Sequence, residues 1–504
     1  MRFFEKRTNQ ENECGDGSLS IRSHEELRDY LHTAFFGTDD LVIDLIERND
    51  EIMALIQLAT LTDLEKVDEQ ILSPLNRNHD RLFLNAIKPA KMQELYAPEQ
   101  VVEALTRGNC VVYIEGYPCF YSFNTSIMVQ RSIAEPINEK AFSDSHEGFN
   151  ERLETNLYLL RRKMPTKNLV LRYFEVGQSV NSRVAVVFVG QLANQEVVDE
   201  VEMRIRSLRI DYVSSAGVLD QMIEDTPFSP FPQILSTERV DRVSANLMEG
   251  RIAVMVEGSS NVLILPVTFF AFYQSPDDYN IRWINGSFFR FLRMASFFLA
   301  ITLPAIYISV VSFHFETIPS ELVLPMQVAV MHIPFPPIIE AIVMELTIEL
   351  LREAGLRLHT AVGQTIGIVG GLVIGDAIVR AGFVSNVMII VVASTAIASF
   401  VVPSHDFRET VRILRFPMMI LAATFGFLGI TFGFSFLLIH LCKLEGFGVP
   451  YFYPFSPFRL NSLQDSFVRL PIWSMNRRPM DSRPQKRIRE FFSRGWVKDE
   501  HPKR

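Results

Sequence analysis

The apolar and polar positions divide the chain into two unlike parts. Up to about residue 285, charged residues occur throughout. Within this part, apolar residues recur at three- and four-residue steps over residues 23–105, which predicts helix there. From residue 291 to residue 441, long runs carry almost no charge. This division predicts a soluble region that is joined to a membrane domain.

In the soluble part, short apolar runs alternate with amphipathic stretches. We expect strands at residues 110–115, 119–123, 127–133, 182–190, 209–213, 251–257 and 261–267, and helices at residues 151–162, 194–208, 218–225 and 240–248. The alternation predicts two compact α/β subdomains, residues 21–165 and 166–288, after a polar tail at residues 1–20 that we expect to be disordered. The order of the strands cannot be read from the sequence.

The second part contains four runs that are apolar and about as long as a bilayer is thick: residues 295–313, 361–379, 383–402 and 417–441. Residues 321–335 and 337–353 are shorter or more polar, and they fit a re-entrant, interfacial or pore-lining position. Four spans put both ends of the chain inside but leave the loop with Arg408, Arg412 and Arg415 outside. Five spans place the more basic tail outside instead, so we prefer both ends inside.

The N-terminal residues contain no apolar core of signal-peptide length, so we expect the soluble part on the cytoplasmic side. The predicted fold class is an integral membrane protein. It has an N-terminal soluble α/β region of two subdomains and an α-helical transmembrane bundle of about four or five spans, residues 289–441. A short basic cytoplasmic tail, residues 442–504, follows the bundle.

Four glycines at four-residue intervals lie in the second apolar run, and we call them the glycine row: Gly363, Gly367, Gly371 and Gly375. In a helix they share one ridge that has no side chains, so another backbone can approach it closely. In a soluble helix the four would cost roughly 3–4 kcal/mol relative to alanine. The row therefore predicts a membrane helix that is crowded by its neighbours.

Acidic residues flank the glycine row. A helix is expected to begin at Pro336 and Pro337. On one of its faces a glutamate recurs every four residues, and we call these residues the acid stripe: Glu345, Glu349 and Glu353. In a symmetric oligomer the stripe would form stacked acidic rings that attract cations. The alternative is the solvated face of an interfacial helix with an ordinary Glu349–Arg352 pair.

Asp376 lies inside a predicted span, where an ionisable residue is a functional candidate. The alternative for this carboxylate is an ion pair with Arg380 near the membrane surface.

Composition narrows the chemistry. The net charge of −9 does not indicate a nucleic-acid-binding protein. None of the four cysteines forms a CxxC pair, and free thiols are favoured over a Cys110–Cys119 bridge. The soluble part contains no Walker A loop, nucleophile elbow or HExxH motif. We expect no enzyme, no cofactor and no metal site.

One rigid segment of the soluble part stands out. Its residues, Ser229, Pro230, Phe231, Pro232 and Gln233, cannot form a helix. They form either a packed turn or a contact surface in an assembly.

Several short motifs resemble those of the A subunits of GerA-type spore germinant receptors. They include SPFPQ at 229–233, TER at 237–239, QSPDDY at 274–279, PFPP at 334–337, ELLREAGLRL at 349–358, GQTIG at 363–367 and IVVASTAIASF at 390–400. The resemblance covers roughly residues 110–475. It implies a germination protein of the inner spore membrane that oligomerises into an ion-conducting channel. The implied partners are a transporter-like B subunit that senses the nutrient and a lipoprotein C subunit.

The chain departs from the family pattern at a few positions. Val240 stands where proline often follows TER, and Asp376 stands where we would expect glutamine. The leading hypothesis is a subunit of a nutrient-gated cation channel. The alternatives are a non-conducting scaffold that positions the nutrient-sensing subunit, or an accessory relative that acts in sporulation.

Overall fold

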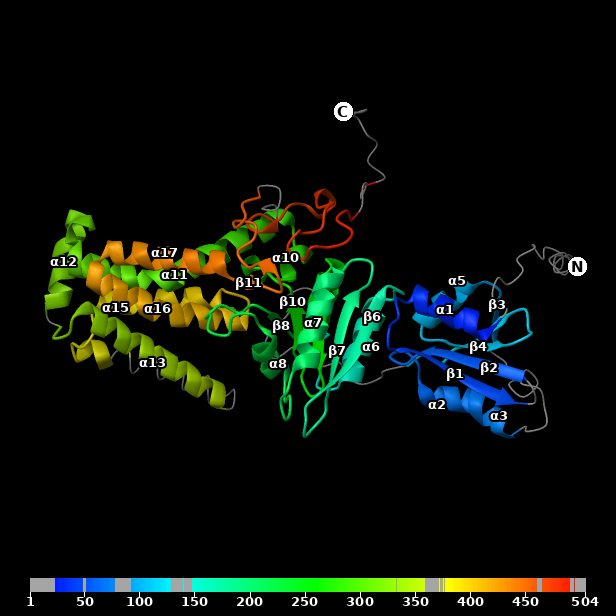
Figure 1. Cartoon of the computed structure of the whole chain (residues 1–504). Helices are drawn as coiled ribbons and strands as arrows, with labels where there is room; N and C mark the ends of the chain where they lie inside the picture. The colour runs from blue at the N-terminus through cyan, green and yellow to red at the C-terminus, as the bar shows by residue number, and fades with distance from the viewer. Residues whose placement is uncertain are drawn as a thin grey trace, which may run out of the picture.

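The computed structural model describes residues 23–48, 51–77, 92–127, 139, 147–331, 333–358, 371, 375, 377–459, 465–489 and 494. Two β-sheets with their helices form a head, and a group of long helices forms the opposite end of the molecule (Figure 1). The expected strand at 127–133 lies almost entirely outside the described residues, as do Gly363, Gly367 and Asp376.

The first sheet has the order β1-β2-β4-β5-β3, and all its neighbouring strands are antiparallel. Its strands are β1 (Leu41–Arg48), β2 (Glu51–Leu58), β3 (Gln93–Leu95), β4 (Cys110–Ile114) and β5 (Phe120–Phe123), and its helices are α1 (His24–Ala34), α2 (Leu64–Val67), α3 (Ser73–Arg77) and α5 (Pro98–Thr106). The cysteines of this sheet, Cys110 and Cys119, are free and buried.

The helix expected over residues 23–105 is wrong at β1, β2 and β3. Residues Met53–Leu58 of β2 are all buried, because the sheet is covered on both faces. A strand of this kind lacks the polar–apolar alternation that would distinguish it from a helix.

The second sheet has the order β6-β7-β9-β10-β8 and is also antiparallel. Its strands are β6 (Leu169–Val176), β7 (Ser182–Val189), β8 (Leu235–Thr237), β9 (Ile252–Val256) and β10 (Val262–Leu265), and its helices are α6 (Leu153–Lys163), α7 (Gln195–Ser207), α8 (Ala216–Ile223) and α9 (Val240–Met248). The strand expected at 209–213 is wrong, since those residues are irregular, and the edge strand β6 was missed. Helix α6 packs against α9, so it belongs to this second unit.

The two sheets repeat one design. Each unit begins with a helix and a β-hairpin, continues through a helical segment to a short strand and another helix, and ends with a second hairpin. In both, the third strand in sequence lies at the edge beside the fifth, which gives the order 1-2-4-5-3. The sequence analysis expected two α/β units but not that they share a topology.

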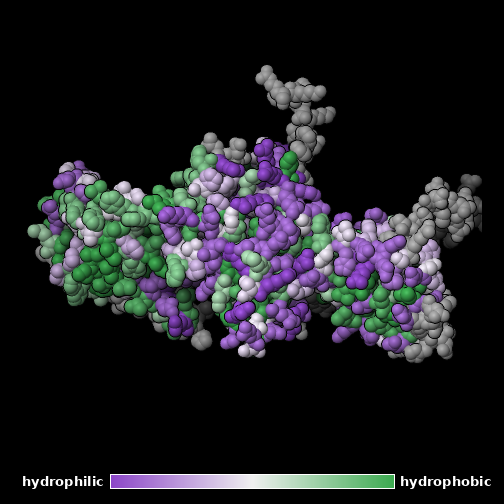
Figure 2. Space-filling view, viewed as in Figure 1, coloured by the Kyte–Doolittle hydropathy of each residue, from purple (hydrophilic) through white to green (hydrophobic). Residues whose placement is uncertain are grey.

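The helical part contains α10 (Asp277–Asn280), α11 (Trp283–Phe313), α12 (Ser320–Met331), α13 (Pro337–Arg357), α15 (Asn386–Phe400), α16 (His405–Phe425) and α17 (Phe427–Lys443). Among the described residues, α11 is the one helix that is long and apolar enough to cross a membrane, and α15 and α17 are shorter apolar helices. Figure 2 shows an apolar surface over this end of the molecule and a polar surface over the second sheet.

The single run expected at 417–441 is wrong. It is divided at Gly426, whose φ of +62° ends α16 and lets α17 fold back. Residues 337–353, which the sequence left unplaced, belong to the 21-residue helix α13.

The helices α11, α13, α15, α16 and α17 run along one another, and their ends meet in two groups. Far from the head, the Tyr307 hydroxyl of α11 is 2.9 Å from the Ser385 hydroxyl, and the Ser385 N–H donates to Glu340 of α13. Near the head, His440 of α17 is 2.9 Å from Ser229. The bundle therefore has a head-side end and a far end.

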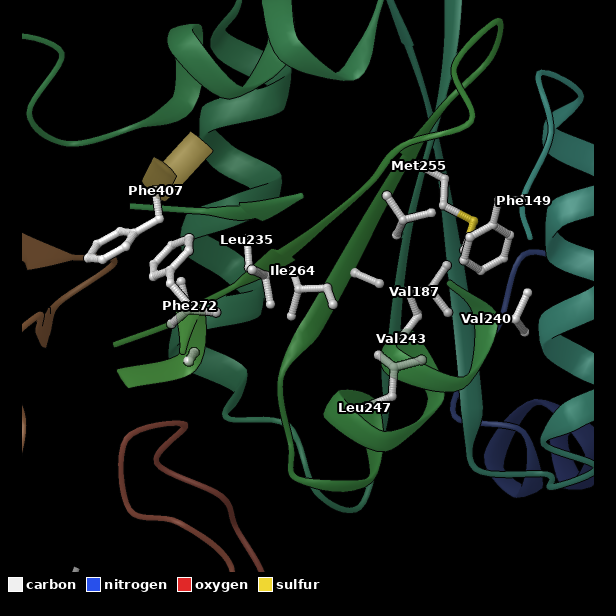
Figure 3. Close-up of a cluster of buried hydrophobic side chains, with 14 of the residues drawn as sticks. Phe149, Val187, Leu235, Val240, Val243, Leu247, Met255, Ile264, Phe272 and Phe407 are labelled. Carbon is white, nitrogen blue, oxygen red and sulfur yellow. The ribbon is translucent and has the colours of Figure 1, made fainter. Parts of the chain in front are cut away.

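One apolar core joins the head to the bundle. In Figure 3 it continues from Val187 and Ile264 of the second sheet through Leu235 and Phe272 to Phe407 of α16. The rings of Phe272 and Phe407 stack with centroids 5.5 Å apart. The head is therefore packed onto the bundle directly rather than held by a linker.

The C-terminal segment folds back onto the head. Asp465 accepts from Arg290 at 2.8 Å and from Tyr279 at 2.7 Å, and Asp481 accepts from Arg251 at 2.6 Å. The expected tail at 442–504 is thus, over its described residues, part of the folded structure and lies on the same side of the bundle as the head (Figure 1).

Candidate functional site

Helix α13 carries the acid stripe, and its first member is sealed inside the bundle. Glu345 is 3% exposed and forms an ion pair with Arg415 of α16, which is also buried. The Arg415 Nε donates to the carbonyl of Ala300 in α11 at 3.0 Å. One guanidinium therefore joins three helices.

The carbonyl of Ala300 needs this donor for a specific reason. Its usual partner in a helix would be the N–H of residue 304, but residue 304 is proline and has no N–H. A carbonyl left without a donor inside an apolar bundle is costly. Arg415 supplies the missing donor and at the same time neutralises Glu345.

The other two members of the stripe are paired but more open. Glu349 lies between Arg352 of the same helix, at 3.3 Å, and Arg412 of α16, and its side chain is 44% exposed. Glu353 pairs with Arg357 at 2.7 Å and is 56% exposed. The Glu349–Arg352 pair, which was part of the interfacial-helix alternative, is present. The stripe as a whole is matched by arginines.

Glu340 is not part of the stripe and is nonetheless buried. Its Oε2 accepts from the N–H of Ser385 at 3.1 Å, while Oε1 has no hydrogen-bond partner among the described residues. The hydroxyl of Tyr307 forms a hydrogen bond with the hydroxyl of the same Ser385. This group fixes the far ends of α11, α13 and α15 together.

Of the glycine row, the structure describes Gly371 and Gly375. A Cβ built on either glycine meets nothing within 4 Å among the described residues. Gly355 of α13 is open in the same way. Among the residues that the structure describes, no backbone lies against the row at Gly371 and Gly375.

Close helix packing through glycine occurs elsewhere, at a pair that the sequence analysis did not single out. A Cβ on Gly429 of α17 would lie 1.9 Å from the carbonyl oxygen of Leu421 in α16, and a Cβ on Gly433 would lie 2.2 Å from the sulfur of Met418. The spacing of four residues between two glycines in an apolar run was the available signal.

The segment Ser229–Gln233 lies between the second sheet and the head-side ends of α16 and α17. Thr410 of α16 donates to the carbonyl of Pro230 at 2.5 Å. The buried ring of Phe231 lies 6.1 Å from Phe407, and Gln233 bonds the backbone of Thr226. Within the chain these residues form a packed turn that connects head and bundle. Phe228, directly before the segment, is 99% exposed.

Two residues at the centre of the site were missed from the sequence. Arg415 was considered only as part of a basic loop, and Pro304 was not considered. A proline within an apolar run indicates that the carbonyl four residues earlier needs another donor. An arginine at the edge of an apolar run indicates that a buried partner for its charge is needed. Which helix would supply the partner depends on the packing, which a single sequence does not contain.

Comparison with known proteins places this arrangement in a family. Residues 29–481 match the family described as Bacillus/Clostridium GerA spore germination protein. The chain is 38% identical over 464 residues to spore germination protein A1 of Bacillus subtilis, covering 89% of this chain and 95% of that one. It is 40% identical over 401 residues to the uncharacterized membrane protein YfkQ of the same organism, covering 80% and 78%. It is 36% identical over 478 residues to spore germination protein GerQA of Bacillus cereus, covering 94% and 95%. The chain belongs to the GerA family of spore germination proteins.

Proposed function

We propose that this chain is the A-type subunit of a nutrient germinant receptor in the inner spore membrane, and that several copies form a nutrient-gated cation channel. The proposed partners are a transporter-like B subunit and a lipoprotein C subunit. Nutrient binding elsewhere would shift the packing of the bundle between two states.

The observation that carries the proposal is the charge on α13. A charged residue at the centre of a bilayer costs about 2.5–3.5 kcal/mol even on the lowest scales. Yet α13 carries four glutamates and two arginines within 21 residues and runs beside apolar helices. Such a helix suits a position that faces water or other copies of the chain rather than lipid. Glu349 and Glu353, both partly exposed, are the proposed pore-lining acids, and Glu345 would hold the helix in place.

The glycine row supplies the proposed contact between copies. Its open side at Gly371 and Gly375 allows a second backbone to approach. Gly363, Gly367 and Asp376 are proposed to continue this contact. The exposed rim of the 229–233 segment, Pro230 together with Phe228, is proposed as a contact between the head and another subunit.

We also propose a topology. The chain passes from the head-side end of α13 at Leu358 to the far end near Ser385, so the segment between them would cross the bundle as well. Together with α11, α13, α15, α16 and α17 this gives six passes, which agrees with a head and a tail on one side, proposed to be the spore core.

A flux measurement in liposomes tests the channel. The chain, alone and with its partners, should conduct cations, and Glu349→Gln and Glu353→Gln should lower the preference for cations. Glu316→Gln, an exposed acid just after α11, is the matched control and should not change the preference. Absence of flux under every nutrient condition, with verified assembly, would exclude conduction.

A non-conducting scaffold is the second candidate, and a specific observation favours it. Each acid of the stripe has an arginine partner, so the stripe carries little uncompensated charge to attract cations. If the glutamine variants assemble and signal normally while no preparation conducts, the scaffold becomes the better explanation.

A further inference from the structure

A cavity of about 490 Å³ lies where the head meets the bundle, apart from the acid stripe. Its polar wall includes Arg239, before α9, and Asp277 of α10. Its apolar wall includes Phe289 of α11, Phe400 of α15 and Val401. The volume lies in the range of ordinary ligand sites, which is about 300–1,000 Å³.

The polar wall carries no excess positive charge, because each arginine already has a carboxylate. Arg242 pairs with Glu139 at 2.6 Å, Arg293 binds Asp278 through two hydrogen bonds of 2.7 and 2.6 Å, and Arg239 binds Asp241 at 3.0 and 2.7 Å. A simple anion would therefore find no uncompensated charge here. A ligand that is neutral as a whole fits better.

Arg239 and Asp277 still present one donor and one acceptor to such a ligand. The Arg239 Nη1 is 3.6 Å from Asp277 Oδ1, which is too long for a hydrogen bond. Asp277 Oδ1 is buried and has no hydrogen-bond partner among the described residues. A buried carboxylate oxygen without a hydrogen bond is unfavourable. A ligand with an N–H-bearing ammonium and an oxyanion would satisfy both atoms.

The rim of the cavity is apolar on the side of the bundle. Phe289 is 45% exposed and Phe400 is 59% exposed, and both line the cavity. Phe288 and Phe291 of the same helix are 62% and 68% exposed. A group of exposed phenylalanine side chains is an apolar surface against which hydrocarbon chains can pack. A free polar solute makes no use of such a rim, whereas a lipid does.

We propose that this cavity binds the headgroup of a phospholipid that carries both a phosphate and a primary ammonium. The ammonium donates to Asp277 Oδ1, the phosphate accepts from Arg239 Nη1, and the acyl chains leave along Phe289 and Phe400. The bound lipid would fill the space between α10, α11 and the connection from α15 to α16.

Lipid retention by the full chain tests the proposal. The protein is placed in nanodiscs of phosphatidylethanolamine, phosphatidylcholine and phosphatidylglycerol, extracted in mild detergent, and weighed by native mass spectrometry. Phosphatidylethanolamine should be retained about tenfold over phosphatidylcholine, whose quaternary ammonium has no N–H to donate. Asp277→Asn should abolish this preference, and Val401→Trp should remove the retained lipid by filling the cavity. Glu445→Gln, an exposed acid just after α17, is the control and should retain the lipid.

Three results would overturn the proposal. The first is equal retention of phosphatidylethanolamine and phosphatidylcholine by the wild type, and the second is an unchanged preference in folded Val401→Trp. The third is binding of soluble glycerophosphoethanolamine or alanine as tight as that of the lipid, which would show that the apolar rim contributes nothing. A matching elution volume and helix content establish that each variant is folded.

Discussion

Arg415 is the residue on which the buried polar contacts of the bundle converge. It neutralises Glu345 and satisfies the carbonyl that Pro304 leaves free in α11. A buried pair of this kind does not have to increase stability, but the loss of one partner leaves the other charge buried alone. The contact is therefore best tested by comparing single and double substitutions.

We expect Arg415→Met to destabilise the chain by about 3–5 kcal/mol, because Glu345 loses its counter-charge and Ala300 its donor. Glu345→Met should cost a similar amount. The double variant should be more stable than the sum of the two single effects predicts, since no charge remains buried alone. Thermal unfolding of the full chain in detergent measures all three. Additive losses would show that the two side chains do not act as a pair.

Asp220 of α8 gives the head a pH dependence. Burial, and then the negative charges of Glu224 and Asp406, raise its pKa to about 8, and its Oδ1 has no hydrogen-bond partner among the described residues. Between about pH 4, where an unfolded aspartate ionises, and pH 8, the folded chain holds a proton that the unfolded chain has lost. Stability from this group is therefore full below pH 4 and falls as pH rises to 8.

Asp220→Asn replaces the carboxyl group that titrates with an amide, whose charge does not change with pH. The melting temperature of the variant should rise relative to that of the wild type as the pH is raised from 5 to 8. Asp211→Asn, an exposed aspartate of the same unit, serves as the control and should follow the wild type. A constant difference between wild type and Asp220→Asn at every pH would contradict the raised pKa.

At the scale of elements, the sequence predicted helices best where the amphipathic pattern was clear. Helix α9 was predicted at its observed bounds, and α7 was predicted one residue too long at each end, since Asn194 is its N-cap, whose side chain accepts from the N–H of Glu196. Strand β2 was mistaken for helix because a strand buried on both faces loses its alternation. The break at Gly426 was missed because α16 and α17 are apolar on both sides of it.

The close packing of α16 against α17 leads to a prediction, because it leaves little room for a side chain at Gly429 or Gly433. Gly429→Ala places a Cβ against the backbone of Leu421, which cannot move away without shifting the helix. Gly433→Ala meets the sulfur of Met418, the end of a flexible side chain. We expect Gly429→Ala to reduce the folded yield and the melting temperature much more than Gly433→Ala does.

Two further variants make this test specific. Met418→Ala should rescue Gly433→Ala but not Gly429→Ala, because it removes the atom that only Gly433 would meet. Gly371→Ala, at an open position, should leave the stability of the single chain unchanged. Equal damage at Gly429 and Gly433 would mean that the helices separate as rigid bodies.

At the scale of the molecule, head, bundle and tail form one packed unit. The core continues from the second sheet into α16, and the C-terminal segment returns to Arg251 and Arg290 (Figures 1 and 3). The sequence predicted the soluble and membrane parts from hydropathy. It could not predict the return of the tail, because such contacts join residues up to 295 positions apart and leave no local pattern. The head therefore contacts α16 directly.

The proposed topology predicts on which side of the membrane each connection between the helices lies. Single cysteines in a background with Cys14 and Cys442 changed to serine, labelled from one side with a membrane-impermeant maleimide, test it. Six passes put Thr317→Cys and Ala381→Cys on one side, and Arg282→Cys, His405→Cys and Glu445→Cys on the other. Four spans, as hydropathy suggests, would instead put residue 381 on the side of residue 282 and residue 405 on the side of residue 317. Labelling of residues 381 and 405 therefore decides between the two counts. If residue 381 labels with residue 282, α13 does not cross, and its glutamates lie at the membrane surface rather than along a pore.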